Sequence, residues 1–110
     1  MEELGRKEQR RFSRWQIDRP VQAKLEGAEA YSECRIKDIS FKGLMIVFKC
    51  KLPEDVFIKL KIILSEEFNI EVQTWVVWHK QVADKNVYGL YFSRIRDFDK
   101  EKIYKFVLKH

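Results

Sequence analysis

Alternation of apolar and polar residues is the main pattern in the first half of the chain. Val21, Ala23 and Leu25 are apolar at every second position, and the segment 31–37 repeats this period with Cys34 and Ile36. A period of two is typical of a strand with one buried face. We therefore predict strands at 21–25 and 31–37, and Pro20 indicates that the first begins at an edge or a bulge.

Four further apolar runs, separated by turn residues, predict the remaining strands. They cover 44–48, 56–64, 70–79 and 87–92, and short polar segments containing Pro53, Ser65 or Asn86 separate the later ones. Gly89 stands inside the last run, which indicates a bulge or a close approach of the backbone. Trp75 and Val77 fall on the outer face of their strand, where we expect them to lie under a helix or at a self-association surface.

The C-terminal segment from 97 to 110 changes to helical spacing. Ile103, Phe106 and Val107 stand at positions i, i+3 and i+4, which predicts an amphipathic helix. Asp99 is the expected N-cap, and Phe98 with Ile103 would form a hydrophobic staple around it.

These elements predict a mainly β protein, a small antiparallel barrel or sandwich with the helix packed against one end or face. The length of 110 residues suits one domain with one core. Residues 1–14 are polar and charged, and we interpret them as a flexible basic arm. Residues 15–110 then form the domain itself.

The charge of the chain favours anionic partners. Lys and Arg number 22 against 17 Asp and Glu, which gives a net charge of +5. Such an excess is compatible with phosphate ligands, nucleic acid or a lipid surface, and does not choose among them. Several of the basic residues crowd the arm: Arg6, Lys7, Arg10, Arg11 and Arg14.

Several classes of function are not indicated. No apolar run approaches the roughly 20 residues of a membrane-spanning helix, and the N-terminus has no apolar signal region. Cys34 and Cys50 are the two cysteines; without a CxxC motif or a nearby histidine they predict no metal site, and reduced thiols in a cytoplasmic protein are the simpler interpretation. His79 has no partner that would suggest catalysis. We expect neither an enzyme nor a cofactor.

Arg10 and Arg14 form an RxxxR segment on the arm. A guanidinium presents five donors in one plane, so it can bind a phosphate or the O6/N7 edge of guanine through two hydrogen bonds, or stack on a base. The alternative is a solvated basic arm with no ligand.

Asp38, Ser40 and Gly43 form a DxSxxG segment between two predicted strands. A carboxylate can accept from the N–H edge of guanine, a serine hydroxyl can donate to phosphate, and glycine allows a positive φ or leaves room for a ligand. The alternative is an ordinary turn in which Asp38 and Ser40 bond their own backbone.

The two motifs, in this order and with strands between them, resemble the PilZ domain, the bacterial receptor module for cyclic di-GMP. The signature of that family is an RxxxR segment followed by a (D/N)xSxxG turn, and both are intact here. The resemblance runs from about Gln9 to the C-terminal helix and includes the segments 44–47, 76–78 and 88–92.

The resemblance implies a six- or seven-stranded antiparallel β-barrel with a C-terminal α-helix, acting as a non-catalytic switch in the bacterial cytoplasm. Cyclic di-GMP would lie across the outer surface of the barrel, and the arm would fold over it. The residues implied to bind it are Arg10, Arg14, Asp38, Ser40 and Gly43. The signal would pass to a downstream protein that the sequence does not identify, and the chain could also form a homodimer.

Two neighbouring residues are further candidates for the ligand site. Arg11 could add a phosphate contact, or it could be a solvated arginine. Trp15 could stack on a base or anchor the arm to the barrel, and we favour the anchor. Whether one cyclic di-GMP binds or a stacked pair is left open by the sequence.

Two other functions stay open at this point. A small basic β-barrel with many aromatic residues could bind single-stranded nucleic acid, although the aromatics alternate as core residues do. A PilZ-like protein could also dock to a partner without nucleotide, but relatives of that kind usually carry damaged motifs.

Overall fold

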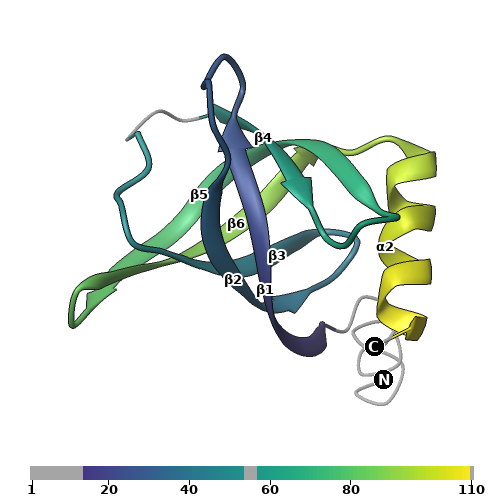
Figure 1. The fold of residues 1–110 in the computed structure, drawn as a ribbon, viewed down its shortest axis with the longest axis horizontal. Helices are drawn as coiled ribbons and strands as arrows, with labels where there is room; N and C mark the ends of the chain where they lie inside the picture. The colour runs from purple at the N-terminus through teal and green to yellow at the C-terminus, as the bar shows by residue number, and fades with distance from the viewer. Residues whose placement is uncertain (1–13, 54–56, 110) are drawn as a thin grey trace, which may run out of the picture.

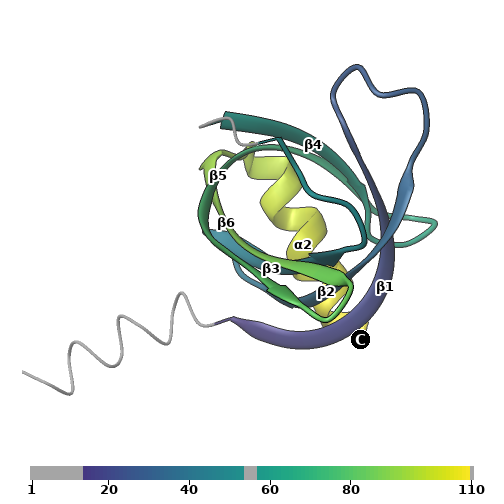
Figure 2. The ribbon, with the colours of Figure 1, turned by 90° about the vertical axis from the view of Figure 1, so that its left-hand side faces the viewer.

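The computed structural model describes residues 14–53 and 57–109, which form a closed antiparallel β-barrel followed by one helix (Figures 1 and 2). The strands are β1 (Trp15–Leu25), β2 (Ser32–Ile39), β3 (Gly43–Phe48), β4 (Phe57–Ile63), β5 (Asn69–Val82) and β6 (Lys85–Arg94), and the helix is α2 (Asp97–Lys109). Around the barrel the strands follow the order β1-β2-β3-β6-β5-β4, and β4 pairs with β1 to close it. The predicted mainly β fold with a terminal helix is confirmed, with six strands.

The core fills the barrel with the apolar side chains that alternate along each strand. Ile36, Ile46, Leu60 and Leu90 are almost completely buried on the inward face. Ile103 and Phe106 of α2 are also buried in this core, so the helix covers one end of the barrel (Figure 1). The period-two and helical patterns of the sequence therefore correspond to the inward faces of these elements.

Strand β1 begins earlier than the sequence pattern indicated. It starts at Trp15, and a β-bulge between Gln16 and Arg19 places Asp18 at a φ of 42°. Pro20 lies within the strand, in a part that pairs with β2 but not with β4. On the side of β1 that faces β4, pairing begins only after Pro20. Because proline has no N–H to donate, this unpaired side is a place where it costs the sheet no hydrogen bond.

The prediction that Asp99 is the N-cap of the helix is wrong. The helix begins at Asp97, and Asp99 lies inside its first turn, fully buried. The carboxylate of Asp99 accepts a hydrogen bond from Nε of Arg96 at 2.7 Å. Phe98 is half exposed and lies under the cations of Arg96 and Lys102, so it does not form the predicted staple with Ile103.

The hairpin of β5 and β6 is longer than predicted and projects from the barrel at the end away from α2 (Figure 1). Asn86, expected in the loop, is a buried residue of β6 whose side chain bonds Nε2 of His79 and the carbonyl of Lys49. The bulge predicted as one possibility at Gly89 is found on the partner strand, where the register shifts between Val76 and Trp78, and an added Cβ at Gly89 would collide with the indole of Trp78.

In the part of the chain that the structure describes, no helix has the length and apolar character needed to cross a membrane.

Candidate functional site

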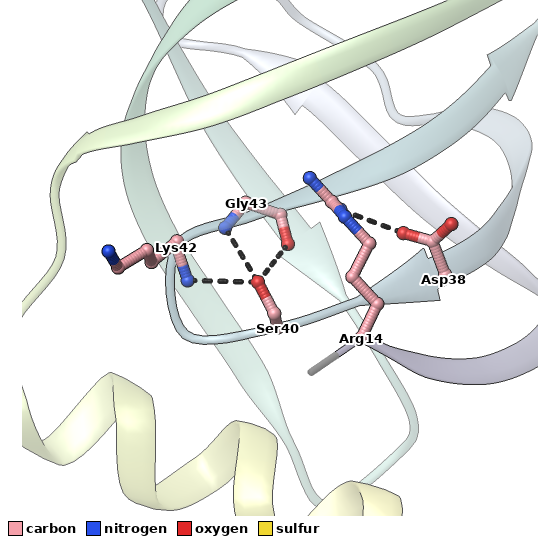
Figure 3. Close-up of polar contacts among 5 residues, drawn as sticks. All are labelled: Arg14, Asp38, Ser40, Lys42 and Gly43. Carbon is pink, nitrogen blue, oxygen red and sulfur yellow. Dashed lines mark hydrogen bonds and ion pairs between the residues drawn. The ribbon is translucent and has the colours of Figure 1, made fainter. Parts of the chain in front are cut away.

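The DxSxxG segment forms the tight connection between β2 and β3 (Figure 3). Oγ of Ser40 accepts hydrogen bonds from the backbone N–H groups of Lys42 at 3.0 Å and Gly43 at 3.2 Å. The same hydroxyl donates to the carbonyl of Gly43, and the N–H of Ser40 donates to that carbonyl at 2.8 Å. Ser40 is 2% exposed, so its hydroxyl is fully used in holding the turn.

Gly43 allows β3 to approach β6 closely. It pairs with Tyr91, and an added Cβ would collide with the carbonyl oxygen of Leu90. Its φ is not positive, in contrast to that of Gly27. The glycine of the motif is therefore required by strand packing in this structure, not by the left-handed conformation that the sequence analysis allowed for.

Arg14 and Asp38 come together at the end of β2 (Figure 3). Nη1 of Arg14 donates to Oδ1 of Asp38 at 2.8 Å. The side chain of Asp38 is 8% exposed and that of Arg14 is 47% exposed. The antiparallel pairing of β1 with β2 explains this meeting, because it sets Gln16 opposite Asp38 and so brings the start of β1 to the carboxylate.

Trp15 fixes the first residue of β1 to the turn. Its ring packs edge to face on Phe41, with ring centroids 5.3 Å apart, and both side chains pack against the core. This contact is compatible with the anchoring role favoured from the sequence, which stays a prediction because residues 1–13 lie outside the described part of the chain. Stacking of Trp15 on a base stays a hypothesis.

A second charged cluster joins the bulge of β1 to β2 and was not among the predicted site residues. Asp18 accepts hydrogen bonds from Nε of Arg35 at 2.7 Å and from Nζ of Lys37 at 3.0 Å. Hydrogen bonds from Arg35 and then from Lys37 lower the pKa of Asp18 below its ordinary value. The cluster lies at the β-bulge of β1, which Pro20 indicated as one possibility, but the ion pairs themselves have no signal in the sequence.

The remaining predicted site residues, Arg10 and Arg11, lie outside the described residues. Among the residues that are described, no group of three or more His, Cys, Asp or Glu side chains could hold a metal ion.

The geometry suits an anionic ligand that also carries N–H donors. Arg14 uses one of its five donors on Asp38, and its half-exposed guanidinium keeps others for phosphate or for a guanine edge. The carboxylate of Asp38 has further acceptor positions for N–H groups. The turn that Ser40 closes fixes the end of β2, where the side chains of Arg14 and Asp38 meet.

Comparisons with known proteins identify the family and the fold. A family model described as the PilZ domain matches residues 8–109. The structure of the Bacillus subtilis inhibitor of motility, MotI/DgrA, superposes with a TM-score of 0.65 at 21% identity, covering 89% of this chain and 48% of that one.

The Borreliella burgdorferi PlzA protein in complex with c-di-GMP superposes with a TM-score of 0.52 at 22% identity, covering 92% of this chain and 36% of that one. The chain thus spans less than half the length of either structure. No curated protein matches it in sequence.

Proposed function

Because the chain belongs to the PilZ domain family, we propose that it is a receptor for cyclic di-GMP, which binds at the junction of β1 with the β2–β3 turn. The observation that carries the proposal is the ion pair between Arg14 and Asp38, one residue from each motif, directly beside the turn that Ser40 closes.

The ligand has two phosphates and two guanine bases, and the residues present complementary groups. Arg14 would donate to a phosphate oxygen or to the O6/N7 edge of a guanine, and Asp38 would accept from guanine N–H groups. Ser40 and Gly43 act by holding the turn, since the Ser40 hydroxyl is satisfied within it. Arg10 and, in a lesser role, Arg11 would contribute from the arm.

The response to the ligand would be a change in the position of the arm. Ordering the backbone of each arm residue costs about 1–2 kcal/mol, so the new phosphate contacts have to exceed that cost. Trp15, packed on Phe41, gives the arm a fixed point at the barrel. We infer that the protein is a non-catalytic switch without a cofactor, whose signal a downstream protein receives.

The similarity to the PlzA structure supports the choice of ligand at the level of the fold, because that protein is described in complex with c-di-GMP. The alternative of a nucleotide-independent docking protein is less well supported here, since both motifs are intact.

Motif variants test the site. We expect Arg14→Ala and Asp38→Ala each to weaken cyclic di-GMP binding at least tenfold, about 1.4 kcal/mol or more. Lys105→Ala, which removes a positive charge from α2, should bind as the parent does. Equal affinities of the parent and Arg14→Ala would refute the assignment. Salt-sensitive binding of a short single-stranded RNA, with no response to cyclic di-GMP, would favour the nucleic-acid alternative instead.

A further inference from the structure

The outer face of β4, β5 and β6 carries three exposed aromatic side chains in cross-strand register. Phe57 stands opposite Trp75, and Trp75 stands opposite Tyr91. The ring centroids are 5.6 Å apart in the first pair and 5.7 Å apart in the second. The three residues, which we call the aromatic row, are 51%, 43% and 41% exposed. The expectation that a helix covers Trp75 is therefore wrong.

The apolar surface continues along β5 beyond the aromatic row. Val77 is 63% exposed and Trp78 is 42% exposed. Aromatic side chains carry about 150–250 Å² each, so these four partly exposed rings present about 350 Å². A homodimer interface of ordinary size takes about 800 Å² from each copy and is about 65% apolar, which is roughly 500 Å². With Val77, this face approaches what one copy of a dimer contributes.

The charges that flank the aromatic row are nearly balanced. Lys59 pairs with Glu26 at 3.4 Å, and Lys61 pairs with Glu71 at 3.6 Å. Arg94, opposite Gln73, adds a positive charge that makes no ion pair with another described residue. Arginine is enriched at protein interfaces.

The near balance of charge on this face distinguishes between two possible partners, a second copy of the chain and a nucleic acid. Two copies with a net charge of +5 repel each other, and the repulsion is least where the approaching faces are close to neutral. A nucleic acid would instead favour a face with a large excess of cations. The face around the aromatic row therefore suits a second copy of the chain better than it suits a nucleic acid.

The shape of the face is compatible with self-association. A groove of about 310 Å³ adjoins the row, and its lining includes Lys59, Gln73 and Arg94. A two-fold interface uses the same patch on both copies, so it needs a projection and a recess within one surface. The aromatic row and the groove lie within one surface, since Lys59 and Gln73 of the groove stand two residues from Phe57 and Trp75.

We propose that this outer face of β4, β5 and β6 is a self-association surface, occupied by a second copy of the chain in a two-fold symmetric dimer. The face adjoins the candidate ligand site, because Tyr91 pairs with Gly43 and the N–H of Phe92 donates to the carbonyl of Lys42 at 2.7 Å. The proposal does not depend on the ligand.

Sedimentation velocity of the full chain tests it over a concentration range of about 10 to 500 µM. We expect the parent to pass from monomer to dimer within that range. Trp75→Ser should raise the dissociation constant at least tenfold, and Tyr104→Ser, at a 48% exposed residue of α2, should leave it unchanged.

A second variant, Phe57→Ser, keeps the test decisive if circular dichroism shows that Trp75→Ser does not fold. A parent that stays monomeric throughout the range would overturn the proposal. Dimers that form in Trp75→Ser and Phe57→Ser as well as in the parent would also overturn it. A monomeric protein that binds single-stranded RNA through Trp75 would overturn it too.

Discussion

Arg14 and Asp38, which are 24 residues apart in the chain, are joined by a hydrogen bond of 2.8 Å beside the β2–β3 turn. The carboxylate is almost buried and the guanidinium is half exposed. Arg14 therefore compensates the charge of the Asp38 carboxylate, and its guanidinium at the same time presents hydrogen-bond donors to solvent.

Because Asp38 is nearly buried and Arg14 is half exposed, removing Arg14 alone should lower the free energy of unfolding more than removing both members of the pair. Arg14→Ala leaves a nearly buried carboxylate without its partner and should lower the free energy of unfolding by about 1–2 kcal/mol. Adding Asp38→Ala to that variant should recover part of the loss, because the unpaired charge is gone. Urea denaturation of the parent, both single variants and the double variant measures the coupling. Strictly additive effects would contradict the pairing.

Gly43→Ala tests the close approach of β3 to β6. The new Cβ collides with the backbone carbonyl of Leu90, so the two strands have to separate. We expect a loss of about 3 kcal/mol in unfolding free energy. Gly27→Ala is the matched control, since its Cβ would meet no atom within 4 Å but its φ is 88°; it should cost only about 1 kcal/mol. Equal losses in the two variants would show that packing at Gly43 is not the cause.

Ser40→Ala should loosen the turn without disrupting the barrel. The substitution removes the acceptor for the N–H groups of Lys42 and Gly43. Leaving a buried donor such as the N–H of Gly43 without its acceptor costs about 1–3 kcal/mol. Hydrogen exchange followed by NMR should show faster exchange of these two amides than in the parent, with little change in the strands of the core. Unchanged protection of both amides would argue against this role of the hydroxyl.

The two cysteines should differ in reactivity. Cys34 is buried, and desolvation raises the pKa of its thiol to about 12, whereas Cys50 is exposed. The thiolate is the reactive form, so iodoacetamide at pH 8 should modify Cys50 alone in the native protein. Peptide mass spectrometry identifies the labelled site, and labelling of both residues in urea is the control. Rapid native labelling of Cys34 would be inconsistent with its burial.

The same pKa shift predicts a dependence of stability on pH. Above the ordinary pKa of 9.0 the unfolded thiol ionises, whereas the folded thiol stays protonated up to about 12. The unfolded state thus binds fewer protons in this window, and the contribution of Cys34 to stability falls as pH rises from 9.0 towards 12. Cys34→Ala should show a smaller alkaline decrease than the parent in urea titrations at pH 8 and pH 10. Parallel decreases would assign the effect to other groups.

The barrel could be predicted in outline because its strands alternate with the period of an inward face. Ile36 and Leu60, for example, sit where the apolar pattern placed them. The features that were missed depend on contacts distant in sequence. The ion pairs of Asp18 with Arg35 and Lys37 join two strands, and the carboxylate of Asp99, in the first turn of α2, is buried with a hydrogen bond from Arg96.

The candidate site was predictable as a set of residue types, but not in its geometry. Motif spacing and family resemblance grouped Arg14 with Asp38. The direction of the Ser40 hydroxyl, the contact between Gly43 and Leu90, and the packing of Trp15 on Phe41 follow from how β1, β3 and β6 meet at the turn. Bonding of Ser40 to the backbone of its own turn was one of the two possibilities that the sequence left open, whereas no local pattern encodes the other two contacts.

Isothermal titration of the purified protein with cyclic di-GMP, with GTP as the control ligand, tests the central proposal most directly. We predict binding of cyclic di-GMP in the micromolar range or tighter, about −8 kcal/mol or better, and none for GTP under the same conditions. The stoichiometry will also distinguish one ligand from a stacked pair. Absence of binding by cyclic di-GMP, or equal binding of GTP, would contradict the account.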